Sequence, residues 1–308
     1  MSVLMIFRIA FKALSRNKLR TALTMLGMII GVGAVITMVA LGNGAQESID
    51  AQIQSTGTNI IQVSAGNFAA QGVRQGQGAA STLVPEDAAA IAEIQGVQYV
   101  SATSNTRGQM IAGNLNWNAQ VNGVDVDYPL IRAWPTQIGA FFTAQDVSTA
   151  SKVVVLGATV RDQLFGEGAD PVGQVMRIGN HPFTVVGVMA VKGQSSTGQD
   201  QDDVAFAPYS TVMKKMRGIT FVQQITVSAA SATDTSATAD RIAAALRIRH
   251  KIQTGDPDDF RAQTMDEIAA VRKETTQTMT ALLSGIAGVS LLVGGIGIMN
   301  IMLVSVTE

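Results

Sequence analysis

Few residues in the sequence could perform acid–base or nucleophilic chemistry. The chain has two histidines and no cysteine, so neither disulfides nor thiolate metal sites can form. His181 precedes a proline, His250 lies at a basic helix end, and neither occurs in the H-E-x-x-H pattern of zinc peptidases. Surface or structural roles therefore fit both histidines better than catalysis.

The sequence also lacks the common nucleotide-binding signatures. No lysine follows a glycine, which excludes the phosphate-binding loop G-x-x-x-x-G-K-[ST], and no G-x-S-x-G nucleophile elbow occurs. The stretch "GVGAVI" at 31–36 matches only the first half of a dinucleotide fingerprint and lies inside an apolar segment. We therefore expect a chain that is not an enzyme and holds no cofactor.

One acidic stretch offers oxygen ligands for a cation. Asp200, Asp202 and Asp203 could hold calcium, but they lack the ordered spacing of a calcium-binding hand. A solvated loop is the simpler interpretation, and no metal site is predicted.

Two long uncharged segments dominate the rest of the sequence. The first, "TALTMLGMIIGVGAVITMVAL" at 21–41, covers roughly 30 Å as a helix, which is the thickness of the hydrocarbon layer. A cleaved signal peptide is the alternative, but its apolar region is usually shorter. The second uncharged run spans 275–307, with its apolar centre at 281–306. We predict transmembrane helices at 21–42 and 281–306.

The basic residues predict the orientation of these helices. Residues 1–20 contain five basic side chains and no acidic one, so the positive-inside rule places the N-terminus in the cytoplasm and the central residues outside. Residues 1–20 fit either an interfacial amphipathic helix or a charged flank that only sets topology. The basic stripe of such a helix comprises Arg8, Lys12, Arg16 and Arg20.

Small residues recur at intervals of four in both apolar segments. Small side chains let helix backbones approach closely in lipid, although glycine is common in membrane helices in any case. Neither segment contains an ionisable group, so an ion relay is not expected. The candidate packing residues are Gly27, Gly31, Ser284, Gly288, Ser290 and Gly294.

Both predicted membrane helices continue into stalks outside the bilayer. Thr264 and Glu267 match a capping box, so one helix is predicted from Met265 to Val306, about 63 Å long and roughly twice what a bilayer needs. The predicted stalk positions are Ile49 and Ile53 after the first span, and Ile268 and Val271 before the second.

The residues between the stalks mix strand and helix patterns. Apolar β-branched runs such as "NIIQVSA" and "KVVVLG" indicate strands, and "PEDAAAIAEI" indicates a helix that begins at a proline. "VQYVSATSNTRGQMIAGNLNWNAQVNGV" reads as two paired strands, whereas 64–82 is rich in Gly, Ala and Gln and reads as a mobile loop. We predict an α+β fold whose middle part, 137–218, is richer in strands.

Three motifs resemble a known family, the MacB-type ABC transporter permeases. They are "AFKALSRNKLRTALTMLGMIIGVGAVITMVALGNGAQ", "LGATVRDQLFGEGADPVGQVMRIGNHPFTVVGVM" and the terminal "LLVGGIGIMNIMLVSVTE", and they occur in the family's order along nearly the whole chain. The resemblance implies an inner-membrane, multi-pass permease that passes the motion of a cytoplasmic ATPase to a periplasmic domain and so drives efflux of antibiotics, peptides or similar cargo. It also implies a porter-like part (43–136 and 219–264), a sabre-like insert (137–218) and a stalk helix (265–280).

The resemblance further implies partners. These are a second copy of the chain, an ATPase domain or subunit, the lipid bilayer, and a periplasmic adaptor with an outer-membrane channel. Residues 64–82 could contact such an adaptor or be a plain linker. No basic patch elsewhere indicates nucleic acid.

The family pattern continues beyond "VSVTE" into a coupling segment and further spans, so we expect a permease truncated after its second membrane helix. Related permeases release lipoproteins or control cell-wall hydrolases, and the sequence does not distinguish these subtypes. A membrane-anchored sensor or receptor has the same layout of two spans around an exterior domain and is the alternative from another class.

Overall fold

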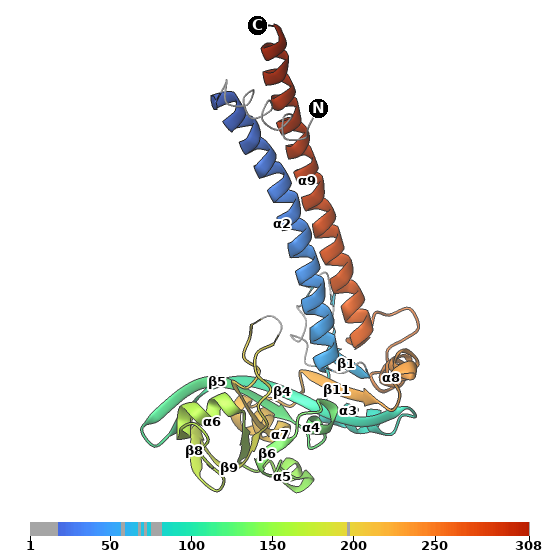
Figure 1. Cartoon of the computed structure of the whole chain (residues 1–308). Helices are drawn as coiled ribbons and strands as arrows, with labels where there is room; N and C mark the ends of the chain where they lie inside the picture. The colour runs from blue at the N-terminus through green and yellow to red at the C-terminus, as the bar shows by residue number, and fades with distance from the viewer. Residues whose placement is uncertain are drawn as a thin grey trace. The chain divides into compact units, whose positions relative to one another are not determined.

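The computed structural model describes residues 18–56, 59–66, 69–70, 73–74, 82–195 and 198–307 (Figure 1). The chain divides into two compact units. One, here called the helix unit, comprises Met1–Asp50 and Ala270–Glu308, and the other, the sheet domain, comprises Ala51–Ala269. The two units are described separately.

The elements alternate between helix and strand, as the mixed pattern of the sequence predicts. The helices are α2 (Lys18–Thr56), α3 (Pro85–Ala92), α4 (Tyr128–Ile131), α5 (Ala144–Thr149), α6 (Ala158–Phe165), α7 (Tyr209–Thr211), the π-helix η1 (Val212–Arg217), the 3-10 helix η2 (Ala232–Asp234), α8 (Thr235–Arg249) and α9 (Met265–Thr307). The strands are β1 (Ile60–Ala65), β2 (Ala69–Ala70), β3 (Val73–Arg74), β4 (Val97–Ala112), β5 (Leu115–Val124), β6 (Thr136–Gly139), β7 (Val153–Leu156), β8 (Val175–Ile178), β9 (His181–Met189), β10 (Val204–Pro208), β11 (Gln224–Ala229) and β12 (Phe260–Thr264).

One ten-stranded sheet organises the sheet domain, in the order β12-β1-β11-β4-β5-β10-β7-β9-β6. The remaining strand, β8, pairs with both β4 and β9. The pairings therefore return to β4 and close a ring of β4, β5, β10, β7, β9 and β8, which removes free strand edges from this part of the sheet. The long strand β4 joins this ring to the open sheet formed with β11, β1 and β12.

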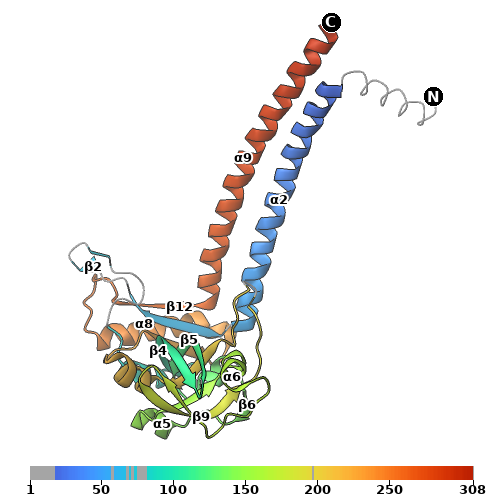
Figure 2. The ribbon, with the colours of Figure 1, turned by 90° about the vertical axis from the view of Figure 1, so that its left-hand side faces the viewer.

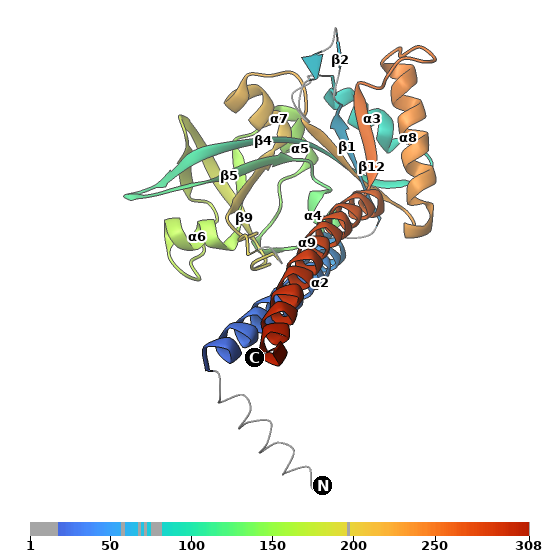
Figure 3. The same cartoon turned by 90° about the horizontal axis from the view of Figure 1, so that it is seen from above.

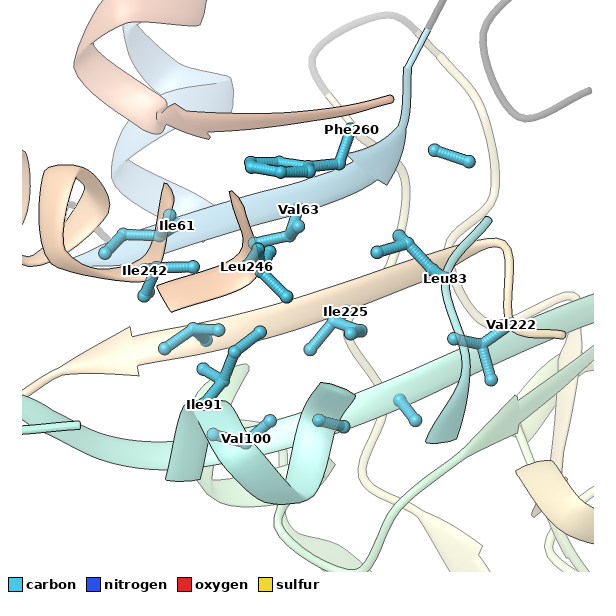
Figure 4. Packing of buried hydrophobic residues seen from close by; sticks show 14 of the residues in the cluster. Ile61, Val63, Leu83, Ile91, Val100, Val222, Ile225, Ile242, Leu246 and Phe260 are labelled. Atoms are coloured by element: carbon cyan, nitrogen blue, oxygen red, sulfur yellow. The ribbon is translucent and has the colours of Figure 1, made fainter. Parts of the chain in front are cut away.

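The open part of the sheet is buried on both faces along β11, where residues 225–229 are all buried. On β1, Ile61 and Val63 pack with Ile242 and Leu246 of α8. Ile60 points to the opposite face of the strand and belongs to a different cluster. Figure 4 shows the larger cluster, in which side chains of α3 and α8 meet those of β1, β4 and β11. Figure 3 shows α3 and α8 beside β1 and β12. A second core fills the strand ring and includes Phe183.

The helix unit consists, among the described residues, of the parts of α2 and α9 within its bounds. The two helices run side by side and antiparallel (Figures 1 and 2). As unbroken helices, α2 has 39 residues and α9 has 43, so α9 is about 65 Å long.

Several local predictions are confirmed. The stretch 97–124 forms the hairpin β4–β5, and the helix predicted to begin at Pro85 forms α3. The predicted loop 64–82 begins too early. Its first two residues, Ser64 and Ala65, are the last residues of β1 and pair with β12. Most of the remaining loop lies outside the described residues, except for Gly66, the short pair β2–β3 and Thr82.

Candidate functional site

Strand β12 passes directly into α9 without an intervening residue. Thr264 is the last residue of the strand, pairs with Ile61, and also caps the helix. Its Oγ1 accepts a hydrogen bond from the Glu267 amide at 3.1 Å, and its own amide donates to the Glu267 carboxylate at 3.3 Å. This reciprocal pair is the predicted capping box, and it satisfies two groups that a helix start would otherwise leave unpaired.

The first turn of α9 is anchored by apolar contacts as well. Met265 packs with the buried side chains of Ile60 and Ile131, and Ile268 and Tyr99 pack against the same cluster. The Gln62 side-chain amide lies 3.6 Å from the Met265 sulfur. The predicted stalk residue Ile268, in the first turn of α9, thus packs against the sheet domain to which it belongs.

The surfaces of α2 and α9 are apolar and exposed over long stretches. Met25–Ser48 and Met265–Ile296 are, among the described residues, long and apolar enough to cross a membrane by length and composition. Exposed apolar surface of this extent indicates contact with lipid or protein. Its large side chains include Ile29, Ile30, Ile36 and Leu41 on α2, and Leu282, Ile286, Val289, Leu292 and Ile296 on α9.

A glycine of α2 closely approaches a threonine of α9. A Cβ added at Gly42 would lie 2.8 Å from Thr280 Oγ1. The Thr280 hydroxyl donates to the Thr276 carbonyl at 2.8 Å, so its side chain is not free to turn away. Gly42 was not among the predicted packing residues, because its partner on another helix cannot be read from spacing along one helix.

The predicted packing residues lie elsewhere on these helices. A Cβ at Gly27, Gly288 or Gly294 would meet no atom within 4 Å, while Gly31 is buried and Ser284 is exposed. Nothing is described of the Ser290 side chain. Their role in helix packing stays a prediction.

The other predicted site residues are only partly described. Arg8, Lys12 and Arg16 lie outside the described residues. Arg20, Ile49 and Ile53 lie in α2, without described side chains, and Val271 is exposed on α9. The interfacial stripe and the outer stalk also stay predictions.

A buried polar cluster joins α3 to the end of α8. The Asp87 side chain is only 2% exposed; it accepts from the Val84 amide at 2.9 Å and pairs with Arg249 Nε at 3.0 Å. The His250 ring lies between two carboxylates, with Nε2 3.2 Å from Asp87 and Nδ1 2.8 Å from Asp259. The structural role predicted for His250 fits this arrangement.

The acidic stretch near 200 is not the solvated loop expected from the sequence. Asp202 is 3% exposed, and its carboxylate accepts hydrogen bonds from the amides of Lys192 and Gly193. Asp203 accepts from Trp117 Nε1, and Asp200 accepts from Thr159 Oγ1. These carboxylates are used to fold the segment, which spacing alone did not reveal. No group of three or more potential metal ligands occurs in the part of the chain that the structure describes.

A half-open cleft of about 520 Å³ lies in the sheet domain. The start of α3, the residue after β5, and helices α5, α7 and η1 line it. Ser210 Oγ donates to the Val147 carbonyl and Thr211 Oγ1 donates to the Ser151 carbonyl at 2.7 Å, so α7 is tied to α5 and the residues after it. No sequence pattern pointed to this cleft, because its walls come from distant segments.

A match to a known family model identifies the family of this chain. The family model described as "MacB-like periplasmic core domain" matches residues 21–245, which is well over half of the chain.

The chain belongs to the MacB-like periplasmic core domain family.

Curated relatives agree with this assignment. The chain is 40% identical over 300 residues to the "Macrolide export ATP-binding/permease protein MacB" of Bdellovibrio bacteriovorus, covering 97% of this chain and 46% of the relative. It is 42% identical to the protein of the same description from Chlorobaculum tepidum, with the same coverage. The chain thus spans about half the length of these relatives. The predicted resemblance to MacB-type permeases is confirmed.

Solved structures confirm the fold of the MacB-like core domain. The periplasmic region of MacB from Actinobacillus actinomycetemcomitans aligns with a TM-score of 0.59 at 24% identity, over 72% of this chain and 96% of that one. The extracellular domain of the noncanonical ABC-type transporter YknZ from Gram-positive bacteria aligns with a TM-score of 0.54 at 18% identity, over 67% of this chain and 100% of that one. The mixed α/β domain is therefore that of MacB periplasmic regions.

Proposed function

We propose that this chain acts as a permease part of a MacB-like ABC transporter, which passes movement between an ATPase and a periplasmic domain. In this proposal, α2 and α9 cross the bacterial inner membrane and the sheet domain lies in the periplasm. The basic residues before the first span support this orientation. ATP hydrolysis comes from an ATPase domain or subunit outside this sequence, since the sequence lacks a phosphate-binding loop.

The continuous path from β12 into α9 carries the proposal. The strand is paired with β1, its last residue caps the helix, and the first helical turn is packed against Ile60 and Ile131. The helix then continues for 43 residues, about twice the number that a bilayer needs. A displacement of the helix therefore acts on the sheet without a flexible linker in between.

The proposal includes a dimer, because two sheet domains are needed to enclose cargo between them. Export of a macrolide, a peptide or a similar molecule is the proposed outcome, by analogy with relatives described as macrolide exporters. An adaptor and an outer-membrane channel are the proposed further partners.

Cysteine labelling tests the proposed topology directly, since the chain has no cysteine of its own. Glu167→Cys on the sheet domain and Arg20→Cys before the first span are each exposed to a membrane-impermeant maleimide in spheroplasts. We expect labelling of Glu167→Cys in intact spheroplasts, and of Arg20→Cys only after lysis. Labelling of both before lysis, with membrane integrity verified, would contradict the proposed orientation.

A further inference from the structure

The cleft of the sheet domain has the size of a small-molecule site. Its volume of about 520 Å³ falls in the range of about 300–1,000 Å³ that is usual for ligand pockets. One wall is the rare π-helix η1, and such irregular turns are frequent at functional sites. Met213 and Lys214 of this helix line the cleft.

Two acidic groups and one phenol line this cleft: Asp125, Glu86 and Tyr209. The Asp125 amide donates to Ser101 Oγ at 3.0 Å, and Asp125 Oδ1 accepts from the next amide, that of Val126. Its Oδ2 accepts no hydrogen bond from any residue that the structure describes. The same holds for the Glu86 carboxylate and the Tyr209 hydroxyl, and within the described chain neither acid forms an ion pair.

The charges in the cleft influence each other. Burial raises the pKa of Asp125, opposed by its bond to the Val126 amide and aided by Asp127. Burial also raises the pKa of Tyr209, and the charges of Asp125 and then Glu86 add to this. A positive charge placed among these groups would relieve both the burial cost and the repulsion.

The rest of the lining combines apolar side chains with Ser148, Ser210 and Thr220. Val147 and Met213 are buried at the wall, and Ile219 is half-buried. The one basic residue among the lining groups, Lys214, is exposed. The cleft thus combines two acidic groups with several apolar side chains.

We propose that this cleft binds an organic cation, a molecule with a protonated amine next to an apolar ring or chain. The amine lies between Asp125 and Glu86, with Tyr209 beside it, and the apolar part lies against Val147 and Met213. The site does not depend on whether the two long helices cross a membrane.

Other ligand classes fit less well. A bare metal ion needs more oxygen ligands than this cleft offers, and no metal-holding group occurs among the described residues. An anion would be repelled by Asp125 and Glu86. The start of α3 attracts negative charge, but Glu86 and Asp87 already supply it.

Binding of three indole compounds tests the proposal. Tryptamine is a cation, tryptophol is its neutral alcohol counterpart, and indole-3-propionate is an anion of similar size. The full chain in nanodiscs of zwitterionic lipid is titrated with each by calorimetry, up to the solubility limit, and empty nanodiscs are subtracted. We expect saturable binding of tryptamine at least about tenfold tighter than that of tryptophol, a difference of about 1.4 kcal/mol.

Variants locate the binding. Asp125→Asn removes the charge and keeps an acceptor for the Val126 amide, and it should weaken tryptamine binding about tenfold or more. Glu86→Gln changes an exposed side chain and should not unfold the domain, so the test remains decisive even if Asp125→Asn is unstable. We expect Glu86→Gln to weaken tryptamine binding about threefold. Glu167→Gln is the matched control, because Glu167 is exposed and does not line the cleft.

The outcomes are clear in each direction. Selective tryptamine binding that both cleft variants weaken and the control leaves unchanged supports the site. No saturable tryptamine binding, equal binding of tryptophol, tighter binding of indole-3-propionate, or unchanged affinity in Glu86→Gln and the folded Asp125→Asn would overturn it.

Discussion

His250 and Asp87 are 163 positions apart in the sequence, yet Nε2 of the histidine lies 3.2 Å from a carboxylate oxygen of the aspartate. The other ring nitrogen contacts Asp259 at 2.8 Å. Burial alone would lower the pKa of His250, but the hydrogen bonds to Asp259 and Asp87 outweigh it and raise that pKa above its usual 6.5. The His250 ring therefore links the end of α8 to α3 and to the segment before β12.

This pair predicts that the sheet domain loses stability as the pH rises. A group whose pKa is raised by folding stabilises the fold fully below the unfolded value of about 6.5, and this contribution disappears as the pH passes the raised folded value. Urea unfolding, followed by the fluorescence of Trp117 and Trp134, measures it across that window. The difference in unfolding free energy between wild type and His250→Gln should shrink with rising pH.

The other histidine supplies the control for this measurement. His181→Gln should keep the pH dependence of the wild type, because the His181 side chain, unlike that of His250, forms no hydrogen bond or ion pair with a described residue. A constant difference between wild type and His250→Gln across the same pH range would show that the imidazolium does not stabilise the domain.

Removal of the Asp87 carboxylate should destabilise the sheet domain strongly. Asp87→Ala leaves the Val84 amide, Arg249 and His250 without their shared acceptor, and we expect a loss of about 2–3 kcal/mol in unfolding free energy. Glu86→Ala changes the exposed neighbour in the same helical turn and should stay within about 0.5 kcal/mol of wild type. Equal effects of the two variants would refute the assigned role of Asp87.

The capping box of α9 should protect the first helical turn from hydrogen exchange. Thr264→Ala removes the acceptor for the Glu267 amide and should weaken the helix start by about 1 kcal/mol, which speeds exchange at that amide about fivefold. Thr275→Ala is the matched control within the helix, because the Thr275 hydroxyl donates only to the Val271 carbonyl of its own helix. Unchanged exchange at Glu267 in Thr264→Ala would contradict the cap.

Packing between α2 and α9 should depend on Gly42 and not on Gly44. An alanine at 42 places its Cβ against Thr280, whereas at 44 it meets nothing within 4 Å and gains helix propensity of up to about 1 kcal/mol. We therefore expect Gly42→Ala to lower the efficiency of disulfide formation between cysteines introduced on α2 and α9, and Gly44→Ala to leave it unchanged. Thr280→Ala should restore it in the double variant, because it removes the hydroxyl that the new Cβ meets.

Local signals in the sequence predicted the parts of the fold that depend on near neighbours. The β4–β5 hairpin, helix α3 and the Thr264–Glu267 cap each depend on residues within one short stretch. The long apolar helix α9 was also predicted, because its uncharged, apolar composition can be read directly from the sequence.

Contacts between distant segments could not be predicted in the same way. The pairing of β1 with β11 and β12, and the approach of Asp87 to His250, join positions more than a hundred residues apart. Asp202 was misread because an acidic loop residue looks solvated until the amides that surround it are known. The cleft lined by Glu86, Asp125 and Tyr209 could not be predicted, because these residues come from three separate segments that only the fold brings together.

The central claim is that α9 passes displacement to the sheet domain. It is tested in the complete transporter with its ATPase, by measuring the distance between spin labels attached at Glu167→Cys in both copies. The test variant carries a short glycine insertion after Val271, which is exposed on α9. The same insertion in the turn after Gly168 serves as the control. We expect an ATP-dependent change of the distance between the two labels in the control variant, and the loss of this change in the variant with the insertion after Val271, while ATP hydrolysis continues. The same ATP-dependent change in both variants would contradict the central claim.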